Sequence, residues 1–317
     1  MNGPGAPSRP AGRLPAILGA GALTALVVVQ QTLHLGGTSR LSLALNDAMH
    51  LPMFVAVTLL LAGLLGRRRL GLALGAAVAL AVATEAVQLL TPRDASLVDL
   101  GHDLLGILLA AVGLLGAGPA ARRVGGRAGP VLWWAGVGLV TLGLAGAEPL
   151  RIHLAERARD RAFPVLLTPA AGMPGPLVAT RSELGLVAAP PGWPAGAGAP
   201  AFEVVWAEET WPGVVMLEVV PDWSDYEALA VDVDVLDGRP ITLTANVQYR
   251  TEPRRATWLW RTLQPGPQTV RFPLADLVDP DVGTIDRLIV HVTAQDAGRR
   301  TLLGAVRLVG HAPGDGR

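Results

Sequence analysis

The spacing of apolar residues changes abruptly about halfway along the chain. Before residue 148, long apolar stretches alternate with short polar segments. Five of these stretches approach the roughly 20 residues that a helix needs to cross a bilayer. They cover residues 14–33, 50–66, 70–90, 99–116 and 130–147. We therefore predict a bundle of about five transmembrane helices over residues 14–147, preceded by a short tail of residues 1–13.

The first apolar stretch also has the length of a signal-peptide core. Signal peptides end at a cleavage site of small residues. Val29 is followed instead by Gln30 and Gln31, which do not form such a site. We expect an uncleaved membrane helix here.

From residue 202 the apolar period changes to two, which is typical of β-strands. Residues 230–235 alternate cleanly, and 241–249 do the same. Similar short runs follow at 258–260, 269–272, 288–292 and 302–309. Turn signals such as Asp237-Gly238 separate the runs. The pattern predicts an all-β, jelly-roll-like antiparallel sandwich of about seven to eight strands over residues 201–311, with a tail at 312–317.

Residues 148–200 connect these two halves. The arginine-rich segment 150–163 has apolar residues at roughly helical spacing, so it is either a short interfacial helix or a charged, solvated connector. Residues 164–200 contain eight prolines among many glycines and alanines. That composition predicts a linker with one embedded strand rather than a packed domain.

Charge divides along the same boundary. Ten arginines and five acidic residues before Glu148 give a net charge of +5, and 16 arginines and 21 acidic residues in the remainder give −5. Arginines flank the predicted spans on one side at Arg9, Arg13, Arg67, Arg68, Arg69, Arg122, Arg123 and Arg127, and on the other side at Arg40 and Arg93. The positive-inside rule then places the N-terminus in the cytoplasm and the β domain outside the cell membrane.

Composition also excludes several kinds of chemistry. An acidic outer half without a basic cluster argues against a nucleic-acid partner. The chain has no cysteine, which excludes thiol catalysis, thiolate metal sites and disulfides. No His-Glu-x-x-His pattern and no serine nucleophile motif occurs, so we predict no bound metal and no other cofactor.

Polar residues gather where three predicted helices reach the outer face. Ionisable groups are costly inside a bilayer, so function is the default hypothesis for them. The candidates are Asn46, Asp47 and His50 at the start of the second helix, Glu85 and Gln88 at the end of the third, Arg93 in the following loop, and Asp99, His102 and Asp103 at the start of the fourth. We expect Arg93 to neutralise one or two of the carboxylates.

Helical spacing gives these candidates a common face. Glu85 and Gln88 are three residues apart and share one side of their helix. Asp99, Asp103 and Gly106 form a single stripe that continues to Gly113. Glycines in such a stripe allow a neighbouring helix to approach closely.

The same residues resemble the VanZ-like family, named after a membrane protein associated with low-level teicoplanin resistance. The resemblance covers residues 14–117 approximately and lies in Asn46-Asp47-Ala48-Met49-His50, Glu85-Ala86-Val87-Gln88 with Pro92-Arg93, and Asp99-Leu100-Gly101-His102-Asp103 with Gly106. Three positions depart from the family pattern: Asn46 replaces an aspartate, Asp47 a lysine and Asp103 an asparagine. The resemblance implies an envelope protein that binds a lipid-linked cell-wall component or an amphiphilic glycopeptide-type compound.

The outer half resembles carbohydrate-binding modules and galactose-binding-like jelly rolls. The resemblance covers residues 201–310 approximately and lies in Trp211-Pro212-Gly213-Val214, in Pro221-Asp222-Trp223-Ser224-Asp225-Tyr226 and in the closing segment Leu303-Gly304-Ala305-Val306-Arg307-Leu308. Gly304-Ala305 stands where the last strand often carries an acidic pair. The resemblance implies contact with glycan or a purely structural module.

Sugar sites place aromatic faces beside hydrogen-bonding side chains. Trp258, Trp260, Tyr226 and Arg261 are the candidates for such a site, and Asp222, Asn246 and Gln248 could add hydrogen bonds. Trp258 and Trp260 share one strand face and form either a stacking platform or part of the core. We expect Trp211 and Trp223 to fill the core.

These observations favour a non-enzymatic envelope protein. Its partners would be a membrane lipid or lipid-linked component and a glycan. The alternative is a membrane enzyme that acts on a lipid head group. His50, Glu85, Asp99 and Asp103 are its candidate catalytic residues, and with His102 they are chemically sufficient for acid–base work or for a metal site. The same cluster could also be purely structural. A proton-relaying transporter is disfavoured because no ionisable residue lies near the predicted midplane.

Overall fold

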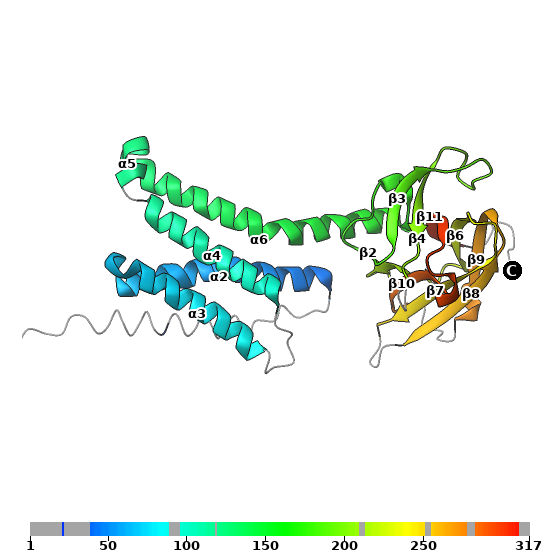
Figure 1. Cartoon of the computed structure of the whole chain (residues 1–317), viewed down its shortest axis with the longest axis horizontal. Coiled ribbons are helices and arrows are strands. Elements are labelled where there is room, and N and C mark those ends of the chain that lie inside the picture. The colour runs from blue at the N-terminus through cyan, green and yellow to red at the C-terminus, as the bar shows by residue number, and fades with distance from the viewer. Residues whose placement is uncertain are drawn as a thin grey trace, which may run out of the picture. The chain divides into compact units, whose positions relative to one another are not determined.

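The computed structural model describes residues 21, 39–88, 96–117, 119–208, 213–250, 255–277 and 283–310. The chain divides into two compact units, Met1–Arg151 and Ile152–Arg317. Figure 1 shows helices in the first unit and mainly strands in the second.

Apolar helices build the first unit. They are α2 (Arg40–Leu65), α3 (Leu70–Gln88), α4 (Leu97–Gly116), the short α5 (Pro119–Gly125) and α6 (Gly129–Ala162), which continues into the second unit. Four segments of the described chain are long and apolar enough to cross a membrane, judged by length and composition: Arg40–Leu65, Arg67–Gln88, Leu97–Gly116 and Ala121–Ala162. They correspond to the second to fifth predicted spans. The first, 14–33, lies outside the described residues except for Gly21.

The start of α2 differs from the prediction. The helix begins at Arg40, after Ser39, whose hydroxyl oxygen accepts a hydrogen bond from the backbone nitrogen of Ser42 at 3.1 Å. Such a cap satisfies a backbone donor at a helix start. His50, predicted to open this helix, therefore lies inside it, because the polar residues before it interrupt the apolar pattern but not the helix. Gly66, with a φ of 79°, ends α2.

The helix α6 also differs from the prediction. Residues 150–163 were expected to form either a separate interfacial helix or a connector. Instead the helix runs without a break from Gly129 to Ala162 and contains Pro149. The arginine-rich segment is the C-terminal part of this helix.

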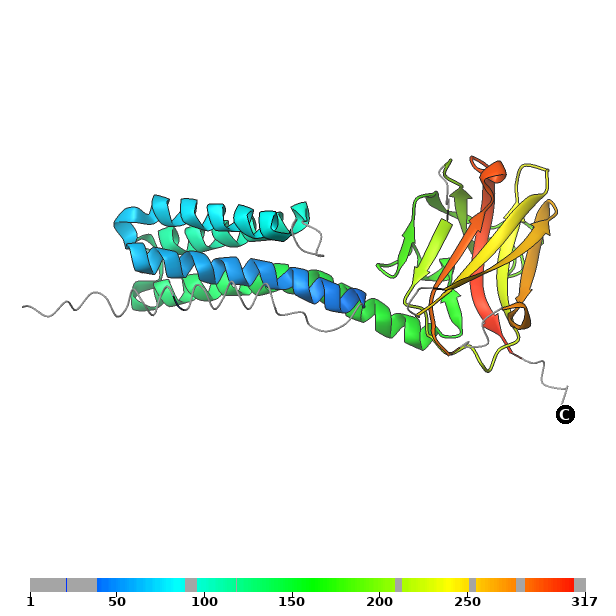
Figure 2. The same cartoon turned by 90° about the horizontal axis from the view of Figure 1, so that it is seen from below.

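The helices α2, α3 and α4 pack side by side around a small apolar core (Figure 2). This core contains Met53, Phe54, Val57, Ala77, Ala81 and Ile107. A Cβ atom at Gly106 of α4 would overlap the backbone oxygen of Leu51, so a glycine is required for this contact between α4 and α2. A Cβ at Gly113 would overlap the ring of Trp134 on α6. The predicted close approach at the glycine stripe is confirmed.

The outward surfaces of these helices are strongly apolar. The exposed large side chains include Leu72, Val82, Leu97, Leu108, Leu115, Val131, Leu139 and Leu142. Soluble domains rarely expose so much contiguous apolar surface, which usually marks contact with a membrane or a partner.

Two antiparallel sheets form the second unit. The strands are β1 (Val165–Leu167), β2 (Val178–Thr180), β3 (Glu183–Ala188), β4 (Pro200–Val205), β5 (Gly213–Leu217), β6 (Ala228–Val235), β7 (Ile241–Tyr249), β8 (Ala256–Leu263), β9 (Gly266–Pro273), β10 (Ile285–Val292) and β11 (Arg300–Val309). One sheet has the order β3-β4-β11-β6-β9, with β1 paired to β11, and the other has the order β2-β5-β10-β7-β8.

The inward side chains of the two sheets make one continuous core. It includes Phe202, Trp206, Trp223, Tyr249 and Phe272, each almost completely buried. The strands predicted from the period of two, 230–235 and 241–249 among them, lie within β6 and β7. The predicted antiparallel β-sandwich is confirmed.

Residues 164–200 are not a linker, contrary to the prediction. They contribute β1, β2 and β3, which pair with β11, β5 and β4. The turn from β3 to β4 also carries Trp193, which is buried with Leu302 in a small second core. A Cβ at Gly304 would approach the Trp193 ring to 2.6 Å, which gives a reason for glycine in this closing strand. The prolines and glycines that suggested a linker lie mostly in turns between short strands.

Candidate functional site

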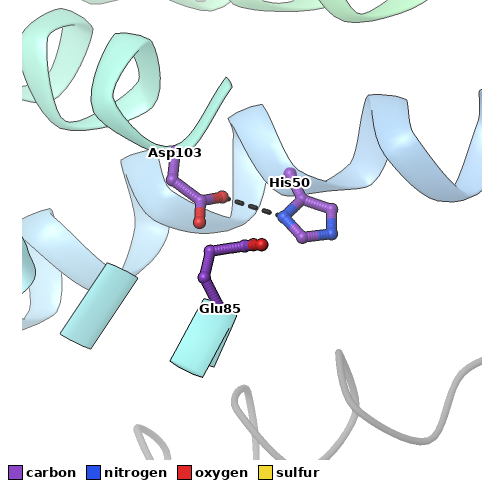
Figure 3. Close-up of side chains that lie close together, drawn as sticks. All are labelled: His50, Glu85 and Asp103. Carbon is purple, nitrogen blue, oxygen red and sulfur yellow. Dashed lines mark hydrogen bonds and ion pairs between the residues drawn. The ribbon is translucent and has the colours of Figure 1, made fainter. Parts of the chain in front are cut away.

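Three helices bring three ionisable side chains together inside the first unit. His50 comes from α2, Glu85 from α3 and Asp103 from α4, and all three are buried. His50 Nδ1 and Asp103 Oδ1 are 2.9 Å apart, within hydrogen-bond distance. Figure 3 shows the Glu85 carboxylate pointing toward this pair. One ligand-type atom from each of the three residues lies within 4.8 Å of those of the other two. We call these residues the buried triad.

Local structure fixes the position of Glu85. Its Oε2 accepts a hydrogen bond of 2.9 Å from the backbone nitrogen of Ser96, the residue that precedes α4. The Ser96 hydroxyl in turn accepts from the backbone nitrogens of Val98 and Asp99. Glu85 therefore joins the end of α3 to the start of α4, and Asp103 lies on the second turn of that helix.

Two oxygens of the triad have no hydrogen-bond partner in the described part of the chain. They are Oε1 of Glu85 and Oδ2 of Asp103. A buried carboxylate oxygen without a partner is costly, because the group has lost its hydration without replacement. The two oxygens can therefore accept hydrogen bonds from a ligand or bind a cation.

The structure distributes the other predicted residues of this cluster differently. Gln88 is buried one turn beyond Glu85, and Asp99 is buried one turn before Asp103, as their spacing predicted. Asn46, Asp47 and His102 are half-buried and lie outside the group of three. Arg93, expected to neutralise the carboxylates, lies outside the described residues.

A second candidate site lies on the edge strand β8. Trp258 and Trp260 alternate with inward-facing Leu259, so both rings belong to the outer face of the sheet. Their exposed fractions are 39% and 64%. Apolar side chains of this size are normally buried in a sandwich, as Trp206 and Trp223 are. We call Trp258 and Trp260 the tryptophan pair.

Polar side chains lie on the same sheet face as the tryptophan pair. Asn246 is opposite Trp258 in the β7–β8 register, and Thr244 is opposite Trp260. The ring of His291 on β10 meets the ring of Trp258 edge-to-face, with centroids 5.5 Å apart. Burial lowers the pKa of His291, although a hydrogen bond to the backbone oxygen of Val292 acts in the opposite direction. Asn246 Oδ1 is buried without a partner in the described structure.

The other predicted sugar-site residues are engaged elsewhere. The Tyr226 ring packs edge-to-face on Phe163 at 5.5 Å. Arg261 lies over the ring of Phe272 and forms an ion pair with Asp276 at 3.2 Å. Trp223 is fully buried in the core, as predicted, and Trp211 lies outside the described residues.

Sequence reasoning did not find His291. It lies in the apolar run 288–292, which predicted a strand but not its neighbours. Only the register of β10 on β7, which pairs His291 with Thr244, brings it to the tryptophan pair.

Comparison with known proteins gives a likeness of fold only. No protein-family model matches the chain, and no curated protein matches it. An exo-β-agarase structure matches over 47% of this chain and 25% of its own, with 9% identity and a TM-score of 0.39. This chain therefore spans about a quarter of that protein.

Carbohydrate-binding modules are also among the similar structures. A family 11 module from Clostridium thermocellum, in complex with a β-1,3-1,4-mixed-linked tetrasaccharide, matches over 42% of this chain and 86% of its own, with 12% identity and a TM-score of 0.32. The CBM22-2 xylan-binding domain from Paenibacillus barcinonensis matches over 46% and 99%, with 12% identity and a TM-score of 0.34. Likeness at this level assigns no ligand to this chain.

Proposed function

We propose that this protein is a membrane-anchored glycan-binding protein of the cell envelope. Its apolar helices span the cell membrane, and its β-sandwich contacts glycan on the outer side through the tryptophan pair. The single observation behind this proposal is the exposure of Trp258 and Trp260 on one face of a sandwich whose other large aromatic side chains are mostly buried.

The chemistry of the tryptophan pair fits a sugar ring. An indole presents a large, flat apolar face that can stack on the C–H face of a pyranose. Asn246 and Thr244 on the neighbouring strand add amide and hydroxyl groups close to the sugar hydroxyls. Trp258 and Trp260 are about 6.7 Å apart along the strand, since they are two residues apart. Two adjacent stacking faces suit a linear polysaccharide better than a single small sugar.

The membrane part of the proposal follows from apolar exposure and charge. Helices α2, α3, α4 and α6 present leucine and valine side chains outward, which is favourable in lipid and unfavourable in water. Arg67, Arg68 and Arg69 lie between α2 and α3, at one end of the bundle. The positive-inside rule assigns that end to the cytoplasm.

Affinity electrophoresis tests glycan binding directly. The full chain in nanodiscs would be run through gels that contain xylan, mixed-linked β-glucan, agarose-derived galactan or soluble peptidoglycan fragments. We expect retardation by at least one of these glycans and a roughly tenfold or greater loss of affinity in Trp260→Ala.

The matched control is Trp133→Ala, which changes a half-exposed tryptophan on α6 instead of the sandwich. It should bind glycan as the unmodified chain does. Binding that survives in the double variant Trp258→Ala/Trp260→Ala would contradict the proposal, as would the absence of binding to every glycan tested.

A second candidate function concerns the buried triad. We propose that this region binds a lipid-linked envelope component or an amphiphilic glycopeptide-type compound, in keeping with the resemblance to the VanZ-like family. The supporting observation is the pair of partnerless carboxylate oxygens. Glu85 and His50 lie about 16 residues, or roughly 24 Å, from the α2–α3 turn. In a hydrocarbon core of about 30 Å we therefore expect the triad close to the outer boundary.

Teicoplanin susceptibility of a sensitive host tests this second function. The host would express the intact chain, Glu85→Ala, the control Glu148→Ala and a truncation that ends near Leu150. We expect protection by the intact chain, the control and the truncation, and loss of protection in Glu85→Ala. Unchanged susceptibility at confirmed expression would remove the teicoplanin link. An enzyme that acts on a lipid head group through His50, Glu85 and Asp99 would instead consume a labelled lipid substrate.

A further inference from the structure

We propose that His50, Glu85 and Asp103 bind a divalent transition-metal ion of the Zn²⁺ type. One imidazole nitrogen and two carboxylate oxygens are common ligands for such ions. They come from three different helices, so no short sequence motif indicates them, and the proposal departs from the sequence-based prediction of no bound metal. The proposal is independent of glycan binding by the sandwich.

The geometry is close to that of a metal site. Zn²⁺ holds nitrogen and oxygen ligands at about 2.1 Å in a tetrahedron, so two ligand atoms lie about 3.4 Å apart. The three ligand-type atoms here lie within 4.8 Å of one another. The widest pair would have to close by at most about 1.4 Å, which a movement of about 0.7 Å by each of the two side chains achieves. Three protein ligands leave a fourth position for water or another oxygen ligand.

Burial distinguishes this group from an ordinary acidic cluster. His50, Glu85 and Asp103 have exposed fractions of 1%, 8% and 0%. Surface carboxylates are hydrated and gain little from a cation, whereas buried carboxylates need one, a proton or a full set of donors. Glu85 Oε1 and Asp103 Oδ2 have no donor in the described structure. Figure 3 shows the Glu85 carboxylate directed at the His50–Asp103 pair.

Charge balance also favours a divalent ion. A protonated His50 can compensate one carboxylate through its contact with Asp103. The second carboxylate, from Glu85, would then need a proton or a cation of its own, because a buried unpaired charge is strongly unfavourable. A divalent cation with a neutral imidazole compensates both carboxylates at once.

Direct metal titration tests the proposal. The untagged full chain in nanodiscs would be stripped with a chelator and titrated with Zn²⁺ in competition with a chromophoric chelator. Co²⁺ would serve as a spectroscopic probe, because its visible absorption reports nitrogen and oxygen coordination. We expect about one ion per chain and a Co²⁺ spectrum of low coordination number.

Two conservative variants identify the ligands. In Glu85→Gln the amide oxygen can still accept from Ser96, and in Asp103→Asn it can still accept from His50, so both variants retain the contacts that hold the helices. We expect each to lower Zn²⁺ affinity by at least about 100-fold. The control Glu148→Gln changes an exposed carboxylate of the same unit and should leave affinity within about threefold of the unmodified chain.

A folding defect is recognised from the unfolding transition without metal, which both variants should retain as the control does. Zn²⁺ should raise the unfolding temperature of the unmodified chain and of the control but not of the two variants, by mass action on the folded state. Stoichiometry well below one in the unmodified chain would overturn the proposal. Equal affinity in the control and in a folded Asp103→Asn variant would overturn it as well.

Discussion

The two units of this chain distribute polar and apolar side chains in opposite ways. The helical unit buries His50, Glu85 and Asp103 and exposes leucines and valines along its helices. The sandwich buries Phe202, Trp223 and other large apolar groups. Its ionic contacts range from the exposed pair of Arg261 with Asp276 to pairs that involve the buried carboxylates of Asp232 and Asp296. Whether either distribution of side chains is stable depends on the solvent around the unit. The first pattern is favourable in lipid and the second in water, which is the basis of the proposed membrane location of the helical unit.

The exceptions in each unit are where function is expected. In the helical unit the exception is a group of buried charges, and in the sandwich it is a pair of exposed tryptophans. Both depart from what folding alone would favour. The following variants test this comparison from the largest expected effect to the smallest.

Removing a core tryptophan from the sandwich should have the largest effect. Trp223 is fully buried, and its indole nitrogen donates to the backbone oxygen of Val220 at 2.8 Å. Trp223→Ala should lower the free energy of unfolding of the second unit by about 3–5 kcal/mol, through lost contacts and a cavity. Thermal unfolding followed by circular dichroism measures this. The same substitution at exposed Trp260 should change stability by less than about 1 kcal/mol. Equal losses would mean that Trp260 also belongs to the core.

A large side chain at the close contact between α4 and α2 should have the next largest effect. Gly106→Leu places a side chain against the backbone oxygen of Leu51 and should destabilise the helical unit by about 3 kcal/mol, because helix backbones cannot yield easily. Gly101→Leu on the same helix meets nothing within 4 Å and serves as the matched control. Monodispersity and unfolding temperature in detergent report the difference. Similar behaviour of the two variants would contradict the observed packing.

The pH dependence of the sandwich's free energy of unfolding should reflect the protonation of His291. Burial holds its pKa below the usual 6.5, so the unfolded chain takes up a proton before the folded chain does. The stabilising contribution is complete above about pH 6.5 and is lost as the pH falls below it, with a slope of at most about 1.4 kcal/mol per pH unit. His291→Gln should flatten the stability profile between pH 7 and 5. An unchanged profile in this variant would assign the slope to other groups.

The smallest effect is expected at Arg261. Its ion pair with Asp276 is largely exposed and should contribute about 0.5 kcal/mol or less. Arg261→Gln should therefore leave both stability and glycan retardation nearly unchanged, in contrast to Trp260→Ala. A loss of glycan affinity as large as that of Trp260→Ala would place Arg261 in the binding site after all.

Much of the architecture could be predicted from residue spacing. The strands β6 and β7 follow a strict period of two, and helices α3 and α4 follow long apolar runs. The prediction of a linker over residues 164–200 was wrong because the strands there, such as β1 and β3, have only three to six residues and lie between turns rich in proline and glycine. Pairing with β11 and β4 holds these strands in place, and such long-range pairing leaves no local signal.

The candidate sites could be predicted only in part. Spacing placed Glu85 with Gln88 and Asp99 with Asp103 on common helix faces, and the structure agrees. Sequence could not determine which face of α2 meets them, so His50 was not separated from Asn46. On β8 the alternation showed that Trp258 and Trp260 share a face. It could not show that this face is the exposed one, because both faces of a sheet can be buried.

Cysteine labelling tests most directly whether the chain crosses the cell membrane, with the α2–α3 turn inside the cell and the sandwich outside. The chain has no cysteine, so single cysteines at Arg68 and Asp222 can be labelled without background. Spheroplasts that express each variant would be treated with a membrane-impermeant maleimide. We expect labelling of Asp222→Cys in intact spheroplasts and labelling of Arg68→Cys only after permeabilisation. Labelling of Arg68→Cys from outside, with Asp222→Cys protected, would contradict the proposed membrane-anchored, outward-facing glycan-binding protein.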